Sequence, residues 1–355
     1  MHKIYSMAPA GKLQQCGYTI MELMISIAIG LLLITGLTTI FVGNSRARNE
    51  LELANQQVEN GRYAMQLLSD DLRNAGFLAE FNPFPLTTPT LKPDPCATDS
   101  TSLKAALPIA VQGYDMGADA PACLSEIRPN TDILVIRRTS TCAVGTTGCD
   151  PEVTGLPYFQ ASGCSGPTEL SSTNSADFYS FDISTANLIK HQKDCVTAAP
   201  YYQYRTHIYF IAENNKSGDG IPTLKRAELS ASGGVATFAV TPLVEGIQDM
   251  QIEYGIDNAS PTTGSPAFFT ADPDKYLTCT GVDCMRYWRN TVAAKVSLLA
   301  RNTRMTVGHK DDKTYYLGLK ADGKTMTDGP YNDNYKRHLY TSVVRLNNTA
   351  GRNTP

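Results

Sequence analysis

The hydrophobic pattern of the chain begins with one long apolar run near its start. From Tyr18 to Val42, 25 residues, Glu22 is the only charged side chain. As a helix this run spans about 37 Å at 1.5 Å per residue, enough to cross a bilayer core about 30 Å thick. The apolar core of a secretory signal peptide is shorter, about 7–15 residues, and ends at a small-residue cleavage site. The pattern therefore predicts a membrane-spanning helix that the chain retains.

A helical period continues after the apolar run. Eight residues recur at alternating steps of three and four and form an amphipathic stripe: Leu51, Ala54, Val58, Gly61, Met65, Leu68, Leu72 and Ala75. The charged residues of this segment lie outside the stripe: Glu50, Glu52, Glu59, Arg62, Asp70, Asp71 and Arg73. Gly76 suits the position after a helix end, and Pro83 and Pro85 prevent continuation. We expect one helix from Tyr18 to about Ala75, with its second half packed on a globular head. A free coiled coil is the alternative.

From about Leu78 the pattern changes to short β-rich runs separated by Pro, Thr, Ser and Gly. The runs that predict strands are Asp132–Arg138, Phe178–Ile183, Thr206–Ala212, Leu224–Leu229, Ile247–Ile256, Thr291–Ala300, Lys313–Leu319 and Leu339–Leu346. Between Gln248 and Tyr254 apolar and polar residues alternate, which predicts a strand with one polar face. We expect an α+β fold whose antiparallel head packs on the helix, with long loops at Pro83–Pro129 and Ser140–Asn174.

Cysteine usage indicates an oxidising compartment. Cys16 precedes the apolar run, and eight cysteines follow it: Cys96, Cys123, Cys142, Cys149, Cys164, Cys195, Cys279 and Cys284. An even set beyond an anchor suits up to four disulfides, although 8 cysteines allow about 105 connectivities. The close pairs Cys142/Cys149 and Cys279/Cys284 are the best candidates for loop staples. A zinc site is not expected because the spacings are irregular and no histidine lies near either pair.

Charge is distributed unevenly along the chain, although the whole sequence has a net charge of only −3. Tyr18 to Cys284 has 16 basic and 29 acidic side chains, a net charge of −13, whereas Met285 to Pro355 has 13 and 5, a net charge of +8. The basic segment either pairs with acidic residues within one fold or presents a basic face to an acidic subunit or nucleic acid. We favour internal pairing because the cations are interspersed with other residues.

Catalytic and cofactor motifs are missing from the sequence. It contains no P-loop, GxGxxG, HExxH or GxSxG pattern, and His191, His207, His309 and His338 are scattered. Residues 214–220 resemble a calcium loop only faintly, and we interpret them as a hairpin turn. Residues 201–205 hold three tyrosines and Arg205, which we interpret as strand residues rather than a stacking platform for bases. An enzyme is not expected, nor is a metal or other cofactor.

The N-terminal motif supplies a family resemblance. Gly17-Tyr18-Thr19-Ile20-Met21-Glu22-Leu23-Met24 lies between a leader with Lys3 and Lys12 and the apolar run. It resembles the class III signal of type IV prepilins. Further segments resemble the PilW family of minor pilins; these are Glu59 to Ala64, Leu67 to Phe77, Leu243 to Gly255, Ala294 to Arg301 and Ser342 to Asn348. The type II secretion pseudopilin GspJ is similar in its helix and β-rich head and is the nearest alternative.

The resemblance implies a pilin-like fold, a long helical spine with a β-rich head. It divides the chain into a leader (1–17), a transmembrane and filament-core half-helix (18–43), an amphipathic half-helix (44–77) and a head (78–355). Prepilin peptidase would cut after Gly17, and Tyr18 would become N-methylated. Glu22 would pair with the N-terminus of a neighbouring subunit. An internal start at Met7 would shorten the leader.

A role in initiating pilus assembly also follows from the resemblance. The expected partners are other minor pilins, the major pilin, prepilin peptidase, the assembly platform and the inner membrane, with a tip adhesin as a further candidate. Nucleic acid is not expected. The protein would reside in the inner membrane with its head in the periplasm, a topology that the basic leader favours, and then at the pilus tip. The alternatives are a secretion pseudopilin or a tip module that binds DNA or surfaces.

Overall fold

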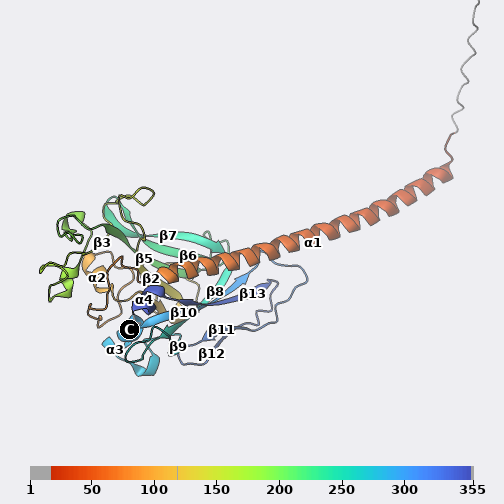
Figure 1. Cartoon of the computed structure of the whole chain (residues 1–355). Coiled ribbons are helices and arrows are strands. Elements are labelled where there is room, and N and C mark those ends of the chain that lie inside the picture. Colours follow the sequence, from red (N-terminus) through yellow and green to blue (C-terminus); the bar gives the residue numbers. More distant parts are fainter. Residues whose placement is uncertain (1–16, 118, 353–355) are drawn as a thin grey trace, which may run out of the picture. The chain divides into compact units, whose positions relative to one another are not determined.

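A computed structural model describes residues 17–117 and 119–352. The chain divides into two compact units, Met1–Glu52 and Leu53–Pro355. Most of the leader, including Met7 and Cys16, lies outside the described residues. Helix α1 (Ile20–Asn74) confirms the expected long N-terminal helix (Figure 1). By length and composition it could cross a membrane.

Two antiparallel sheets form the framework of the second unit (Figure 1). The larger follows the order β1-β2-β5-β3-β4, and β6 and β7 extend it from β5. Its strands are β1 (Val111–Tyr114), β2 (Ile133–Thr139), β3 (Tyr158–Ala161), β4 (Tyr179–Asp182), β5 (Tyr201–Ala212), β6 (Thr223–Ser232) and β7 (Val235–Glu245). The second sheet follows the order β13-β10-β8-β9. Its strands are β8 (Ile247–Ile256), β9 (Phe268–Thr270), β10 (Thr291–Arg301) and β13 (Arg337–Arg345).

Shorter elements connect these strands. A separate hairpin joins β11 (Tyr315–Leu319) to β12 (Thr325–Asp328). The short helices are α2 (Ser100–Ala105), α3 (Val282–Arg289) and α4 (Asn347–Arg352). Single 3-10 turns occur at η1 (Asp115–Gly117), η2 (Ser175–Phe178), η3 (Thr185–Asn187) and η4 (Tyr276–Thr278). The two expected long loops are therefore interrupted by regular structure, by α2 and β1 in the first and by β3 in the second.

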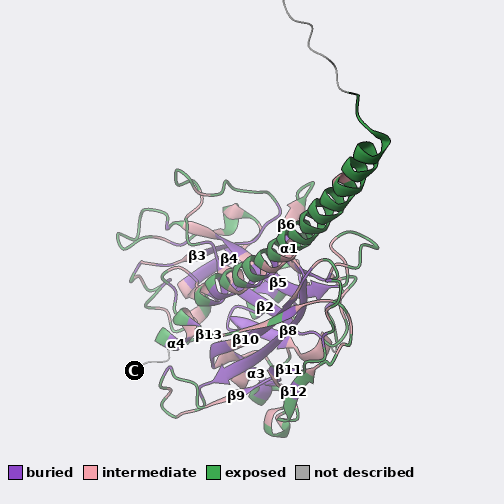
Figure 2. Ribbon diagram, turned by 90° about the vertical axis from the view of Figure 1, so that its right-hand side faces the viewer, coloured by how far each residue is buried: buried purple, intermediate pink, exposed green. Residues whose placement is uncertain are grey.

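The main core lies where the second half of α1 meets both sheets. Ala64, Leu68 and Leu72 of α1 pack in one cluster with inward-facing residues of β2, β5, β8 and β10. In β10 the inward set alternates, with Ala294, Val296 and Leu298 in that cluster, as a strand's period of two requires. Figure 2 shows the strands of both sheets largely buried beside α1. The α+β fold with an antiparallel head is confirmed.

Strand β8 is buried on both of its faces. All of its residues are buried, so its polar side is covered as well as its apolar side. On that polar side the Glu253 carboxylate forms an ion pair with the Lys295 ammonium, at 2.5 Å. The Gln248 side chain accepts a hydrogen bond of 2.9 Å from Arg337. The alternation in the sequence therefore corresponds to two buried faces, one apolar and one polar. Polar groups on a buried face need hydrogen-bond or ion-pair partners, and the segments that cover the face supply them.

The buried stripe of α1 differs from the stripe that the sequence predicts. Val58 is 46% exposed, whereas Gln57 and Asp71 are buried. The buried face follows Gly61, Ala64, Leu68, Asp71 and Ala75, with steps of three and four, so Asp71 occupies a position that the helical period assigns to the core. Treating every charged residue as solvent-facing caused the error.

Eight cysteines form four disulfides in the head. Two join cysteines close in the sequence, Cys142–Cys149 and Cys279–Cys284. The other two close longer loops, Cys96–Cys123 and Cys164–Cys195, with sequence separations of 27 and 31 residues. Each pair has one or both members in a segment without strands, so covalent links stabilise loops where little apolar surface is available.

Candidate assembly elements

The N-terminal motif forms the first turn of α1. Thr19 directly precedes the helix, its side-chain oxygen accepts a bond of 3.3 Å from the Glu22 backbone N–H, and its carbonyl accepts one of 3.1 Å from Leu23 N–H. Thr19 is therefore the N-cap, and the spacing Thr-x-x-Glu is that of a capping box. Glu22 consequently lies in the first turn, where the positive end of the helix dipole favours an acid.

The peptide bond between Gly17 and Tyr18 lies just outside this turn. Residues 17–19 are not helical, and open space surrounds Gly17. The Tyr18 side chain is 87% exposed. The expected cleavage position is thus in non-helical backbone, directly ahead of a capped helix.

Polar side chains within the apolar run are satisfied by the helix itself. The hydroxyls of Ser26, Thr35, Thr38 and Thr39 each donate to the carbonyl four residues earlier, at 2.7–2.8 Å. Such bonds allow hydroxyl groups to enter a lipid-facing helix without unmet donors. Glu22 has no ion-pair partner among the residues that the structure describes.

A buried ionic cluster joins α1 to the large sheet. The Asp71 carboxylate accepts bonds from Arg138 Nε at 2.7 Å and Tyr209 Oη at 2.8 Å, and it lies 2.6 Å from His207 Nδ1. On the opposite side, His207 Nε2 lies 3.2 Å from the Glu228 carboxylate. One α1 side chain therefore contacts both β2 and β5, which fixes the position of the helix on the sheet.

The electrostatics of this cluster favour charged carboxylates. Burial alone would raise the pKa of Asp71, but bonds and charge from His207 and Arg138 outweigh it and hold that pKa well below its ordinary value. The same balance, with burial opposed chiefly by His207, lowers the pKa of Glu228 to about 2. Burial and the nearby Asp71 charge raise the pKa of the Tyr209 hydroxyl, so this group remains a donor.

Further contacts along α1 are specific to its buried face. Gln57 donates to the carbonyls of Ala300 and Lys336, both at 2.9 Å, and Asn60 donates to the Glu245 carbonyl at 3.0 Å. At Gly61 an added Cβ would lie 2.2 Å from the Tyr340 ring. Gly61 is therefore required where the ring crosses the helix, because any side chain would displace it.

The end of α1 is held by the C-terminal segment of the chain. Gly76 adopts a positive φ of 71°, the usual conformation just past a helix end. The Asn348 amide donates to the carbonyls of Asn74 and Ala75, and Arg352 donates to that of Gly76. These bonds satisfy carbonyls that a helix terminus leaves unpaired.

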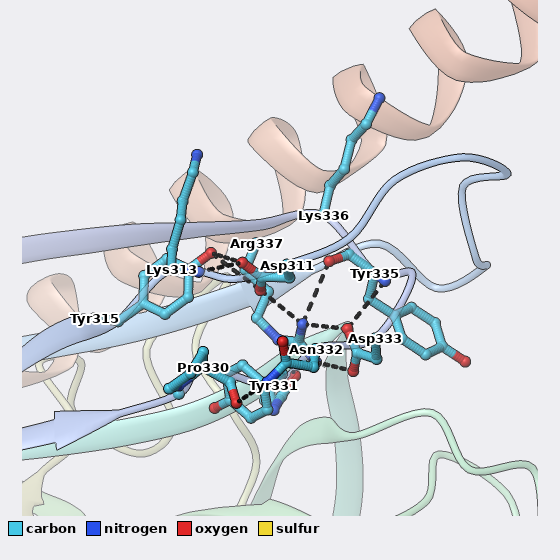
Figure 3. A network of polar contacts seen from close by, with 12 residues as sticks. Asp311, Lys313, Tyr315, Pro330, Tyr331, Asn332, Asp333, Tyr335, Lys336 and Arg337 are labelled. Atoms are coloured by element: carbon cyan, nitrogen blue, oxygen red, sulfur yellow. Dashed lines mark hydrogen bonds and ion pairs between the residues drawn. The ribbon is translucent and has the colours of Figure 1, made fainter.

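Several cations of the basic C-terminal segment have partners inside the head. Figure 3 shows the Arg337 guanidinium between Asp311 and Asp333, with N–O distances of 2.8 and 2.6 Å. The same guanidinium lies 3.7 Å from the centre of the Tyr331 ring. Lys295 pairs with Glu253 as described above. Internal pairing, favoured from the sequence, thus applies to these residues.

The remaining candidate residues from the sequence lie in a turn and in a strand of the large sheet. Residues 214–220 connect the antiparallel pair β5 and β6, and Asp219 accepts N–H bonds within that turn. Tyr204 is buried, and Arg205 is 3.2 Å from Glu228 and also pairs with Asp150. Within residues 17–117 and 119–352 no cluster of His, Cys, Asp and Glu side chains suits a metal ion.

The sequence did not single out His207 or Asp71 as partners. His207 was treated as one of several scattered histidines, yet it is buried between two carboxylates. The signal available was the helical phase of Asp71, since a charged residue at a core position needs a buried partner. Nothing in the sequence indicated which cation or histidine supplies it.

A capped apolar helix that continues into a disulfide-linked antiparallel head defines a pilin-like protein. Two family models match the chain: Type IV Pilus-assembly protein W, PilW, over residues 208–348, and the prokaryotic N-terminal methylation motif over residues 12–38. Searches of curated proteins and of solved structures found no match.

These matches confirm the resemblance to PilW-family pilins. The PilW match runs from β5 to the start of α4 and includes the resembling segments from Leu243, Ala294 and Ser342. Together with the apolar N-terminal helix, the two matches fit a membrane-anchored pilin of the type IV pilus. Pilins are a structural class of protein whose members interact with other pilus components.

Proposed function

We propose that this protein is a structural minor pilin that helps initiate type IV pilus assembly within the priming complex at the pilus tip. Residues 1–17 are a leader that prepilin peptidase removes, and the new amino group of Tyr18 is methylated. Residues 18–43 lie first in the inner membrane and later in the filament core. Residues 44–77 carry the head, residues 78–355, which faces the periplasm before assembly.

The observation that carries the proposal is the presence of both family matches on one chain, the methylation motif at 12–38 and PilW at 208–348. The first supports entry into the pilin pathway, and the second supports a minor pilin of the pilus. Other minor pilins, the major pilin and the assembly platform are the proposed partners.

Glu22 gives the proposal a physical mechanism. A carboxylate in an apolar helix costs a few kcal/mol unless a partner neutralises it. Cleavage after Gly17 creates an ammonium group at Tyr18, four residues before Glu22. A neighbouring subunit's ammonium would pair with Glu22 only at one axial offset, so the pair would set the register between helices as they leave the membrane.

The test compares Glu22→Gln with Glu52→Gln, a matched change on the same helix beyond the apolar run. Each variant replaces the chromosomal copy, and pili per cell are counted by electron microscopy beside a deletion strain. We expect Glu22→Gln and the deletion to remove most pili and Glu52→Gln to retain them, with equal amounts of all proteins in the membrane. Normal piliation in the deletion strain would contradict a role in initiation, and normal piliation with Glu22→Gln would contradict the pairing mechanism.

A further inference from the structure

A cationic hollow lies between α3, α4 and the segment that follows α1. Its volume is about 300 Å³. Three arginines line it, Arg286 and Arg289 from α3 and Arg352 from α4. The wall also includes the Phe84 ring, which is 69% exposed, and Leu107. The hollow therefore combines positive charge with apolar surface.

Two of these arginines have carbonyl partners in place of carboxylates. Arg289 donates to the carbonyls of Phe84 and Leu86 at 2.5 and 2.9 Å. Arg352 donates to the carbonyls of Gly76 and Phe81 at 2.7 and 2.8 Å. In the described part of the chain neither arginine forms an ion pair. Burial lowers the pKa of both guanidinium groups, that of Arg352 to about 10, as expected for cations without a counter-charge.

Carbonyl bonds orient these guanidinium groups but do not neutralise them. The helix dipole places only about half of a negative charge at the C-terminal end of α1, near Arg352. Arg352 uses one N–H of each terminal nitrogen in its two bonds, so further N–H groups remain for a ligand. The fixed geometry resembles a prepared anion site, because orientation is supplied in advance by the fold.

Arg286 supplies a cation that can move toward a ligand. Its side chain is 63% exposed, and its ion pair with Asp283 is 3.4 Å long, between two exposed groups. Exposed ion pairs of this kind contribute little to stability. Arg286 can therefore exchange Asp283 for a bound anion at small cost.

We propose that this hollow binds an organic carboxylate, held by Arg286 and Arg352, with its apolar part against Phe84. The planar guanidinium fork matches a carboxylate in two parallel bonds. The apolar wall favours a carboxylate on a carbon skeleton over a hydrated inorganic anion. The carboxylate belongs either to a free small molecule or to an acidic residue of another pilus subunit. The second source rests on the proposed assembly role, whereas the site itself does not.

The test uses the mature full-length chain in lipid nanodiscs and fluorine NMR. The probe is 4-fluorobenzoate, and the neutral isostere 4-fluorobenzamide is its control. We expect saturable broadening of the benzoate signal and none of the benzamide signal. Arg286→Gln should weaken benzoate binding at least about fivefold. Arg304→Gln, which removes an exposed arginine in the loop after β10, should leave it unchanged.

The proposal would be overturned if the benzoate and benzamide signals broadened equally, or if Arg286→Gln and Arg304→Gln bound benzoate equally well. Arg352→Gln is a second variant, checked for folding by Trp288 fluorescence, and it should also weaken binding. Competition distinguishes a protein carboxylate from a free one. If a pilus subunit co-purifies with the wild type but not with Arg286→Gln, and if benzoate displaces that subunit, the carboxylate belongs to the subunit. Unchanged co-purification together with saturable benzoate binding assigns it to a free molecule. Because the NMR assay needs no pilus, its failure is separate from failure of the assembly role.

Discussion

Asp71 makes buried ionic contacts between α1 and the large sheet. It accepts from Arg138 and Tyr209 and contacts His207, and it is only 7% exposed. A buried ion pair contributes little compared with an apolar replacement, but removing one partner leaves an uncompensated buried charge. The cluster therefore specifies where the helix sits and makes that position sensitive to single substitutions.

Replacing Asp71 with Asn should destabilise the head by about 3 kcal/mol, because Arg138 and His207 lose their shared counter-charge. The neighbouring change Asp70→Asn is the control. Asp70 is exposed and pairs with the equally exposed Arg73, so its loss should cost less than about 1 kcal/mol. Urea unfolding of the mature chain in detergent, followed by fluorescence of the single tryptophan, Trp288, measures both. Equal effects of the two substitutions would show that the buried cluster does not hold the helix.

The same cluster predicts a pH dependence of stability. The pKa values of Asp71 and Glu228 are lower in the folded state than their ordinary values. Their stabilisation is therefore complete above the unfolded pKa values of about 4 and is lost as pH falls toward 2. The stability difference between wild type and Asp71→Asn should narrow over that window. Comparing the two proteins removes the opposite contribution of Asp249, whose pKa burial raises to about 7. A constant difference from pH 7 to 2.5 would contradict this account.

At the scale of elements, the sequence predicted helices and strands that have a clear hydrophobic period. It did not predict which of their faces other segments cover. Helix α1 and strand β8 followed directly from periodicity, and β8 has the bounds expected for it. Strand β7 was missed although Gly233 and Gly234 form the turn before it, a common hairpin signal. Its Pro242 weakens the strand pattern. Strands β1, β3, β9 and β12 have only three or four residues each, too few for a clear period of two.

Arg337 links the long connection between β10 and β13 to the second sheet. Its guanidinium bonds to Asp311 and Asp333 (Figure 3) and to Gln248. Arg337→Lys retains the charge but loses the planar fork, so it cannot keep all these bonds. We expect faster hydrogen exchange in residues 302–336, with β2 and β5 unchanged. Arg345→Lys, at the exposed end of the same strand, should leave exchange unchanged throughout. Equal exchange in the two variants would contradict this role for Arg337.

For the whole molecule, sequence reasoning was strongest where physical constraints are local. An apolar run of membrane length, a helix cap and an even set of cysteines are each visible in short segments. The partners of Asp71 could not be predicted, because the nearest of them in the sequence, Arg138, is 67 positions away. Those of Arg337 include Asp311 and Gln248, which are 26 and 89 positions away. Long-range pairing depends on the folded arrangement of both sheets, which no single periodic pattern specifies.

The central claim is that this chain is a pilin whose mature form begins at Tyr18 after cleavage. It is tested most directly by intact-mass and N-terminal peptide analysis of the full chain expressed with and without prepilin peptidase. The account predicts a peptidase-dependent product that starts at N-methyl-Tyr18 and has eight oxidised cysteines. A chain that stays uncut with the peptidase, or one cut beyond Val42 so that the apolar helix is lost, would contradict it.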